Sequence, residues 1–127
     1  MIRAVKLFYL IAGGAIGTVA RYWLSQVIHE TAGPQFPFGT LMVNSLGCFA
    51  IGILAMMGQG RAHATPEIRL FFMVGLCGAF TTFSTLVLET NNLFKNGQAL
   101  HAFGNVLITL LAGFVAFAVG GWLGSKI

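Results

Sequence analysis

Apolar residues fill four long stretches of this chain, and polar residues concentrate in the short segments between them. We predict helices at residues 4–27, 38–59, 67–95 and 98–123, because each stretch has about 20 residues or more, the length at which an α-helix crosses a bilayer. All three prolines lie in the connecting segments. The pattern predicts an all-α membrane protein whose residues 1–127 form a single four-helix transmembrane domain.

Composition supports a membrane protein and argues against a soluble one. Of the 127 residues, 57% are hydrophobic and 8% are charged, whereas soluble domains have about 25% charged residues. The net charge is +4, but the basic residues are scattered without a patch, so we expect no nucleic-acid partner. The expected location is the inner cell membrane, with multiple passes through the lipid bilayer.

Basic residues are unevenly distributed between the two sides of the predicted bundle. The positive-inside rule therefore predicts a cytoplasmic N-terminus and a cytoplasmic C-terminus. Lys95 falls on the opposite side, and Arg21 lies within or near the end of the first helix. The basic residues on the predicted cytoplasmic side are Arg3, Lys6, Arg61, Arg69 and Lys126.

The first two helices each carry a face of small and polar residues. Gly13, Gly17 and Arg21 follow one another at a spacing of four, so the glycines permit close contact with another helix. Arg21 either anchors the helix at the membrane interface or faces a water-filled vestibule. On the second helix, Asn44 lies one turn from Thr40, and its amide serves either a helix–helix hydrogen bond or contact with an ion.

The middle of the third helix combines glycines and hydroxyl residues within an apolar span. We expect the helix to be broken there, near its middle. Backbone carbonyls freed by such a break are tolerated only where protein or an ion satisfies them, so they suit a cation, while the hydroxyls suit an anion. The alternative is a polar packing seam in which hydroxyls bond to their own helix. The residues are Gly75, Gly78, Thr81, Thr82, Ser84 and Thr85.

Glu89 and a stripe on the fourth helix are the other polar features of the spans. Glu89 is either a proton-relay group or a carboxylate that reaches water near the helix end. On the fourth helix, a polar and small-residue face is expected to pack against the third helix. Its members at successive intervals of four are His101, Asn105, Thr109 and Gly113.

Nothing in the sequence indicates an enzyme or an organic cofactor. The chain has no His or Cys metal-binding spacing, no nucleophile with a base and orienting group, and no phosphate-binding glycine loop. Cys48 and Cys77 lie inside predicted spans, where a thiol behaves as a small apolar side chain.

Three motifs follow one another along the chain, G-x-x-x-R-Y at residues 17–22, G-T-L-x-V-N at 39–44 and G-x-x-T-T-F-S-T at 78–85. Together they resemble the motifs of the Fluc fluoride channels, also called CrcB-like proteins. The resemblance covers the whole chain in order and in length. It implies a passive, highly selective fluoride channel that exports cytoplasmic fluoride and so reduces its toxicity.

The same resemblance implies an assembly and a set of site residues. Two subunits would form an antiparallel, dual-topology dimer, with a structural Na⁺ at the interface bound by the backbone carbonyls of Gly78 and Thr81. Arg21 and Glu89 would lie in the vestibules. The fluoride pathway would include Asn44, Thr82, Phe83, Ser84, Thr85 and Leu86.

Leu86 departs from the family pattern, which has a second phenylalanine at this position. An aliphatic side chain offers no electropositive ring edge, so we expect altered throughput or ion affinity. The basic-residue bias also leaves two partners open, a second copy of this chain or a homologous subunit of opposite topology.

The sequence is also compatible with two other functions. The first is a small multidrug-type cation/proton transporter, although that design has a membrane-embedded acid in the first helix, and the first acidic residue here is Glu30. The second is a non-conducting membrane partner subunit whose polar seams serve only packing.

Overall fold

The chain is all-helical across the residues that the computed structural model describes, which are 2–57, 59 and 64–127. Four stretches are long and apolar enough to cross a membrane, as the hydrophobic pattern predicted. Position 58 of the predicted second helix and Arg61 lie outside the described residues. The four spans are Arg3–Ala32, Phe38–Met57, Pro66–Lys95 and Ala99–Gly124.

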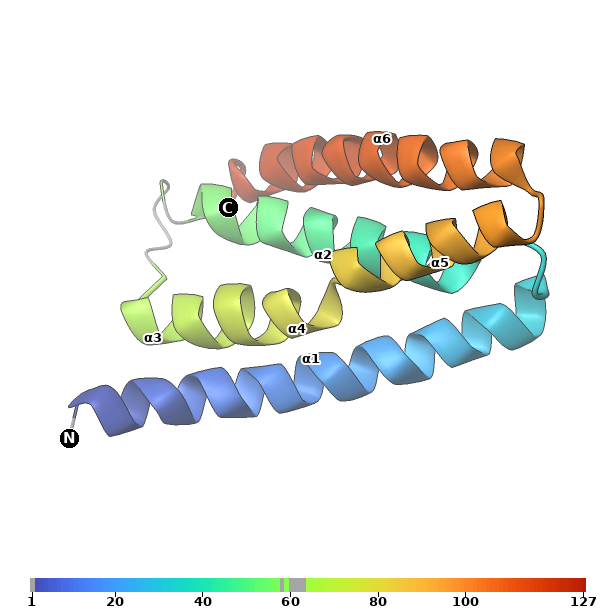
Figure 1. Cartoon of the computed structure of the whole chain (residues 1–127). Coiled ribbons are helices and arrows are strands. Elements are labelled where there is room, and N and C mark those ends of the chain that lie inside the picture. The colour runs from blue at the N-terminus through green and yellow to red at the C-terminus, as the bar shows by residue number, and fades with distance from the viewer. Residues whose placement is uncertain (1, 58, 60–63) are drawn as a thin grey trace.

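The third span, Pro66–Lys95, differs from the other three because it consists of several elements (Figure 1). Between α4 and α5, Thr81 and Thr82 have extended backbone, with φ/ψ of −84°/154° and −150°/113°. We call these two residues the extended pair. In chain order the elements are α1 (Ile2–Ala32), α2 (Phe38–Met57), α3 (Pro66–Arg69), the π-helix η1 (Leu70–Cys77), α4 (Gly78–Phe80), α5 (Phe83–Lys95) and α6 (Ala99–Gly124).

Local sequence explains where several helices begin and end. α1 continues past the predicted range 4–27 until Gly33, whose φ of 87° ends the helix while its N–H bonds His29 O at 3.0 Å. α3 is capped by Thr65, whose hydroxyl accepts a hydrogen bond from the Ile68 N–H at 3.3 Å. Pro66 follows at the first helical position, where no N–H is needed.

The spans pack in two close pairs, α2 with α6 and α1 with η1. Glycine allows both contacts. A methyl group on Gly52 would overlap Phe117 O, and one on Gly17 would overlap Leu76 O. Gly13 likewise lies against Phe71 O, so the predicted close contact of the Gly13 and Gly17 face is present. At both interfaces, backbone approaches backbone without an intervening side chain.

Both chain termini lie at one end of the bundle (Figure 1). Large apolar side chains cover its outer faces, among them Phe8, Val19 and Leu100, all of which are exposed. Such a surface suits hydrocarbon rather than water, and the buried positions are mostly small or polar residues at helix contacts. α5 packs against α6 on the side of the bundle that carries the extended pair.

Candidate functional site

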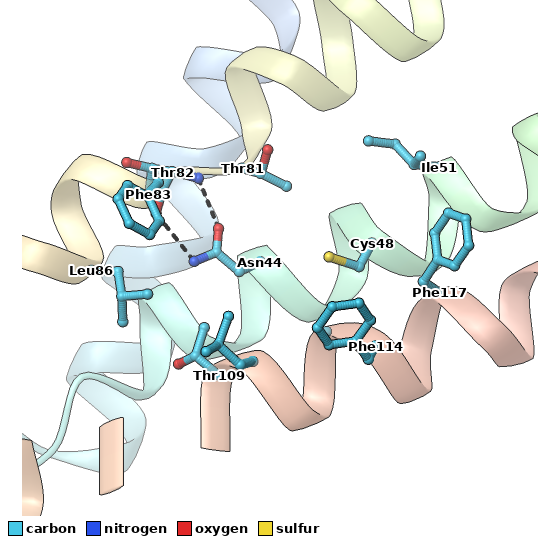
Figure 2. Close-up of a pocket in the computed structure, with 12 residues that line it drawn as sticks. Asn44, Cys48, Ile51, Thr81, Thr82, Phe83, Leu86, Thr109, Phe114 and Phe117 are labelled. Atoms are coloured by element: carbon cyan, nitrogen blue, oxygen red, sulfur yellow. Dashed lines mark hydrogen bonds between the residues drawn. The ribbon is translucent and has the colours of Figure 1, made fainter. Parts of the chain in front are cut away.

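The side chain of Asn44 on α2 binds both the backbone N–H and the backbone carbonyl of Thr82 (Figure 2). The Thr82 N–H donates to Asn44 Oδ1 at 2.7 Å, and Asn44 Nδ2 donates to Thr82 O at 3.2 Å. An interrupted backbone in an apolar environment requires such partners. The amide nitrogen carries a second N–H, and Asn44 is also one of the residues that line a cavity.

The start of α5 is capped by the second residue of the extended pair. Thr82 Oγ1 accepts a hydrogen bond from the Thr85 N–H at 3.2 Å, as an N-cap residue does, and donates to Thr85 Oγ1 at 2.9 Å. Ser84 Oγ lies 3.4 Å from the same oxygen. Three of the predicted hydroxyl residues of the third span, Thr82, Ser84 and Thr85, therefore form one local cluster. The hydroxyl of the fourth, Thr81, instead donates to Cys77 O of its own helix at 2.9 Å.

The break between α4 and α5 leaves several carbonyls without their helical donors, and those of Gly78 and Thr81 are two of them. In a continuous α-helix, the N–H of residue i+4 bonds the carbonyl of residue i. The Thr82 N–H, which would bond Gly78 O, donates to Asn44 instead. The Thr85 N–H, which would bond Thr81 O, donates to Thr82 Oγ1. Gly78 O and Thr81 O are thus free of these bonds and able to bind a hard cation.

A cavity of about 460 Å³ lies beside the extended pair, and we call it the central cavity (Figure 2). Asn44, three threonines and Cys48 line it together with apolar side chains, three of which are phenylalanine rings. Phe83 and Phe114 are each 75% exposed, so the cavity opens onto a face of the chain. The lining residues are Asn44, Cys48, Ile51, Thr81, Thr82, Phe83, Leu86, Thr109, Leu110, Gly113, Phe114 and Phe117.

The predicted pathway residues divide into two groups in the structure. Four of them line the central cavity, and Leu86 among them is only 3% exposed. Ser84 and Thr85 instead take part in the hydroxyl cluster around Thr82 and are not part of the cavity wall. The four lining residues are Asn44, Thr82, Phe83 and Leu86.

The two predicted vestibule residues lie away from the central cavity wall. Arg21 is half-buried on α1, and Glu89 is half-buried on α5. Thr40 Oγ1 donates to Glu89 Oε1 at 2.7 Å, whereas Glu89 Oε2 is buried without a hydrogen-bond partner among the described residues. The carboxylate is therefore tied to α2, one helical turn before Asn44.

Comparison with known proteins places the chain in a family. A family model described as "CrcB-like protein, Camphor Resistance (CrcB)" matches residues 8–121. The chain belongs to the CrcB-like family. With its four apolar spans, this CrcB-like chain is a multi-pass membrane protein.

Curated relatives of this CrcB-like chain match it over most of its length. A protein from Dehalococcoides mccartyi is 42% identical over 120 residues, which cover 94% of this chain and 92% of the relative. One from Hydrogenovibrio crunogenus is 41% identical over 114 residues, covering 90% and 86%. One from Solidesulfovibrio magneticus is 39% identical over 122 residues, covering 96% and 98%. Each of the three is named "Fluoride-specific ion channel FluC".

The cavity of this CrcB-like chain also includes residues that sequence reasoning assigned to packing. Thr109 on α6 lines it, is only 6% exposed, and has a buried Oγ1 without a hydrogen-bond partner among the described residues. Asn105, one turn earlier, donates from Nδ2 to Thr90 Oγ1 at 3.1 Å. The spacing of four on the fourth helix was the available signal, since it placed both residues on one face.

Within the described residues, no group of three or more His, Cys, Asp or Glu side chains could hold a metal ion. An ion at this site would therefore be bound by amide, hydroxyl and backbone groups. Of the two cysteines, Cys77 is buried in η1 and Cys48 lies in the cavity wall. Both thiols are free.

Proposed function

We propose that this chain is a subunit of a passive channel that is highly selective for fluoride. The relatives that match most of the chain and are named as fluoride-specific channels support this proposal. The observation that carries it is the Asn44 amide, which is held by both backbone groups of Thr82 and lies beside Phe83 in the wall of the central cavity. The protein is accordingly a channel and not an enzyme.

The chemistry of the cavity wall suits a small, strongly hydrated anion. Fluoride must exchange its water shell for hydrogen-bond donors, which a pore supplies as amide N–H and hydroxyl groups. The edges of aromatic rings carry partial positive charge and add to this stabilisation. Asn44 and Thr109 provide the polar contacts and Phe83 the ring edge, while carboxylates are kept outside the cavity wall. Ser84 and Thr85 would extend the donor track from the Thr82 cluster.

We assign the extended pair as the functional break of the third helix and the carbonyls of Gly78 and Thr81 as ligands of a structural Na⁺. The loss of their helical donors to Asn44 and to Thr82 Oγ1 supports this assignment. When bound, the ion neutralises carbonyl dipoles that would otherwise be unpaired at membrane depth. We place this ion at the dimer interface because Gly78 is exposed on the monomer.

An antiparallel dimer would cover the open side of the central cavity. Polar groups such as those of Asn44 and Thr82 do not face lipid at membrane depth, because lipid offers no hydrogen-bond partners. The exposed Phe83 and Phe114 rings border the same opening. A second copy of this chain, or a homologous subunit of opposite topology, is the partner that would close it.

The proposed direction of transport follows from charge alone. Fluoride that enters a cell as uncharged HF dissociates at neutral pH and is retained as the anion. A negative interior drives a single negative charge outward by roughly 2.3 kcal/mol per 100 mV. In the inner membrane, a passive channel would therefore export cytoplasmic fluoride and reduce its toxicity without ATP or a coupled ion. Arg21 and Glu89 would influence ion entry in the vestibules.

Fluoride efflux from liposomes that contain only this purified chain tests the proposal. We expect efflux of fluoride but not chloride, and loss of efflux in Asn44→Asp and in Phe83→Ile. Gly14→Ala is the matched control, since a methyl group there would contact nothing within 4 Å. Folded protein without efflux would show that this chain needs a homologous partner or does not conduct. Unchanged efflux in both variants would remove the pathway assignment.

A further inference from the structure

Gly47 on α2 lies directly against Thr81, the first residue of the extended pair. Gly47 is buried, and a methyl group at this position would overlap Thr81 Cγ2. The same methyl group would lie 3.4 Å from Phe80 Cδ1 and 3.6 Å from Thr81 Cβ. The space that the missing side chain leaves is therefore filled by one methyl group, that of Thr81.

Thr81 is not free to rotate its methyl group away from Gly47. Its Oγ1 donates to Cys77 O at 2.9 Å, and its N–H donates to the same oxygen at 3.0 Å. Rotation about χ1 would leave the hydroxyl without this acceptor in an apolar region, which is unfavourable. An added side chain at Gly47 would consequently move the Thr81 backbone rather than only its side chain.

Thr82, the next residue along the chain, is also held by α2. Residues 44 and 47 lie on one face of α2, three positions apart. Asn44 binds the N–H and the carbonyl of Thr82, while Gly47 admits the side chain of Thr81. Because Thr82 is tied down, displacement at Thr81 would change the orientation of the Thr81 carbonyl with respect to that of Gly78.

We propose that Gly47 is a positioning residue for the cation site formed by the Gly78 and Thr81 carbonyls. Gly47 contacts no ion itself. It acts by leaving space for the Thr81 methyl group. This inference rests on the proposed function, since it concerns the ion site assigned there. It predicts that the effect of a side chain at Gly47 depends on the size of the side chain at residue 81.

A double-mutant cycle tests this dependence. Gly47→Ala introduces the overlap, and Thr81→Ser removes the methyl group while retaining the hydroxyl that bonds Cys77 O. In the double variant the overlapping methyl group of residue 81 is absent. The new methyl group at position 47 would then lie 3.6 Å from the Cβ atom of residue 81, an ordinary contact distance. Thr81→Ser alone is the reference for the double variant, and Gly14→Ala is the control for adding a methyl group to an open glycine.

The first measurement is thermal unfolding of the detergent-solubilised protein in sodium chloride and in choline chloride. We expect sodium to raise the unfolding midpoint of the wild type, because a bound ion stabilises the folded state. Gly47→Ala should lose this sodium-dependent rise, and the double variant should regain it. A rise that persists in Gly47→Ala, a double variant as insensitive as Gly47→Ala, or a wild type without any rise would each overturn the inference.

The second measurement is fluoride efflux from liposomes with the same four proteins and the wild type. Gly47→Ala should lower the efflux rate roughly tenfold or more, as overpacking at a rigid contact does, and the double variant should restore most of it. Wild-type protein that shows the sodium-dependent rise but no fluoride efflux would show that this chain does not conduct by itself, while leaving the role of Gly47 intact. Failure of fluoride conduction and failure of the Gly47 inference are therefore distinguishable.

Discussion

The part of the third span before the extended pair and the part after it are held by different kinds of contact. η1 lies against α1 at Gly13 and Gly17, where backbone meets backbone. α5 is joined to α2 by side-chain hydrogen bonds, from Thr40 to Glu89 and, at its N-cap, between Asn44 and Thr82. The same span thus has one half fixed by shape and another fixed by polar groups.

Because the two halves are held by different contacts, we expect substitutions in one half to affect folding and substitutions in the other to affect the chemistry of the site. A glycine contact against backbone tolerates no added atom, because backbone atoms cannot move aside as a flexible side chain can. A hydrogen-bonding side chain can be replaced by one of equal size, so its polar function is removed without overlap. Substitutions before the extended pair should therefore affect assembly of the fold, and those after it should affect conduction.

The largest effect is expected at the contact between α1 and η1. Gly17→Leu would drive a side chain into the backbone of Leu76 and should destabilise the fold by about 3 kcal/mol or more. The measurement is the yield of monodisperse protein in detergent. Gly14→Leu on the same helix is the control, since Gly14 has open space beside it. Equal yields for the two variants would remove the distinction between the two halves.

A smaller effect, directed at conduction, is expected at the start of α5. Thr82→Val keeps the size of the side chain but removes the hydroxyl that caps α5 and bonds Thr85. The combined loss is about 2 kcal/mol and should slow fluoride efflux roughly 30-fold. Thr82→Ser retains the hydroxyl and should stay near the wild-type rate. If both variants conduct alike, the cap does not contribute to the site.

Thr109 allows an effect on conduction to be separated from an effect on stability, because its buried hydroxyl makes no hydrogen bond among the described residues. Thr109→Val should leave the unfolding midpoint unchanged or slightly higher, since no hydrogen bond is lost. If the hydroxyl contacts the ion, efflux should fall roughly fivefold, the value of one hydrogen bond. A fall in thermal stability with unchanged efflux would instead identify Thr109 as a packing residue.

The smallest effect is expected at Leu86, which is buried in the cavity wall. Leu86→Phe would add a ring edge to the pathway and should raise fluoride efflux about twofold. Leu86→Met is the control, because it changes side-chain shape without adding an aromatic ring. Identical efflux and selectivity in all three proteins would show that this position does not influence the ion.

The four spans were predictable because hydrocarbon imposes a length and a composition on any helix that crosses it. The close contact at Gly13 and Gly17 was also predictable, since small residues at a spacing of four allow helices to approach. The π-helical geometry of η1 was not, because the run of apolar residues from Leu70 to Cys77 suits an α-helix equally well.

The partners of the polar residues could not be read from the sequence. Asn44 and Thr82 are 38 residues apart, and an amide can bond any donor or acceptor that the fold brings to it. The sequence left Glu89 open between two roles and gave no sign of its hydrogen bond from Thr40. Thr109 was placed on the correct helix face, but only the tertiary arrangement shows that this face reaches the central cavity.

The π-helix η1 changes the direction in which the later side chains of the third span point around the helix axis. Bonds from residue i to residue i+5 place an extra residue in each turn compared with an α-helix, so every side chain after η1 is rotated about the helix axis. With this rotation, Gly75 meets Gly13 of α1 while Thr81, six positions later, meets Gly47 of α2. Deleting one residue from 70–77 would rotate Thr81 away from Gly47, although none of the deleted positions lines the central cavity.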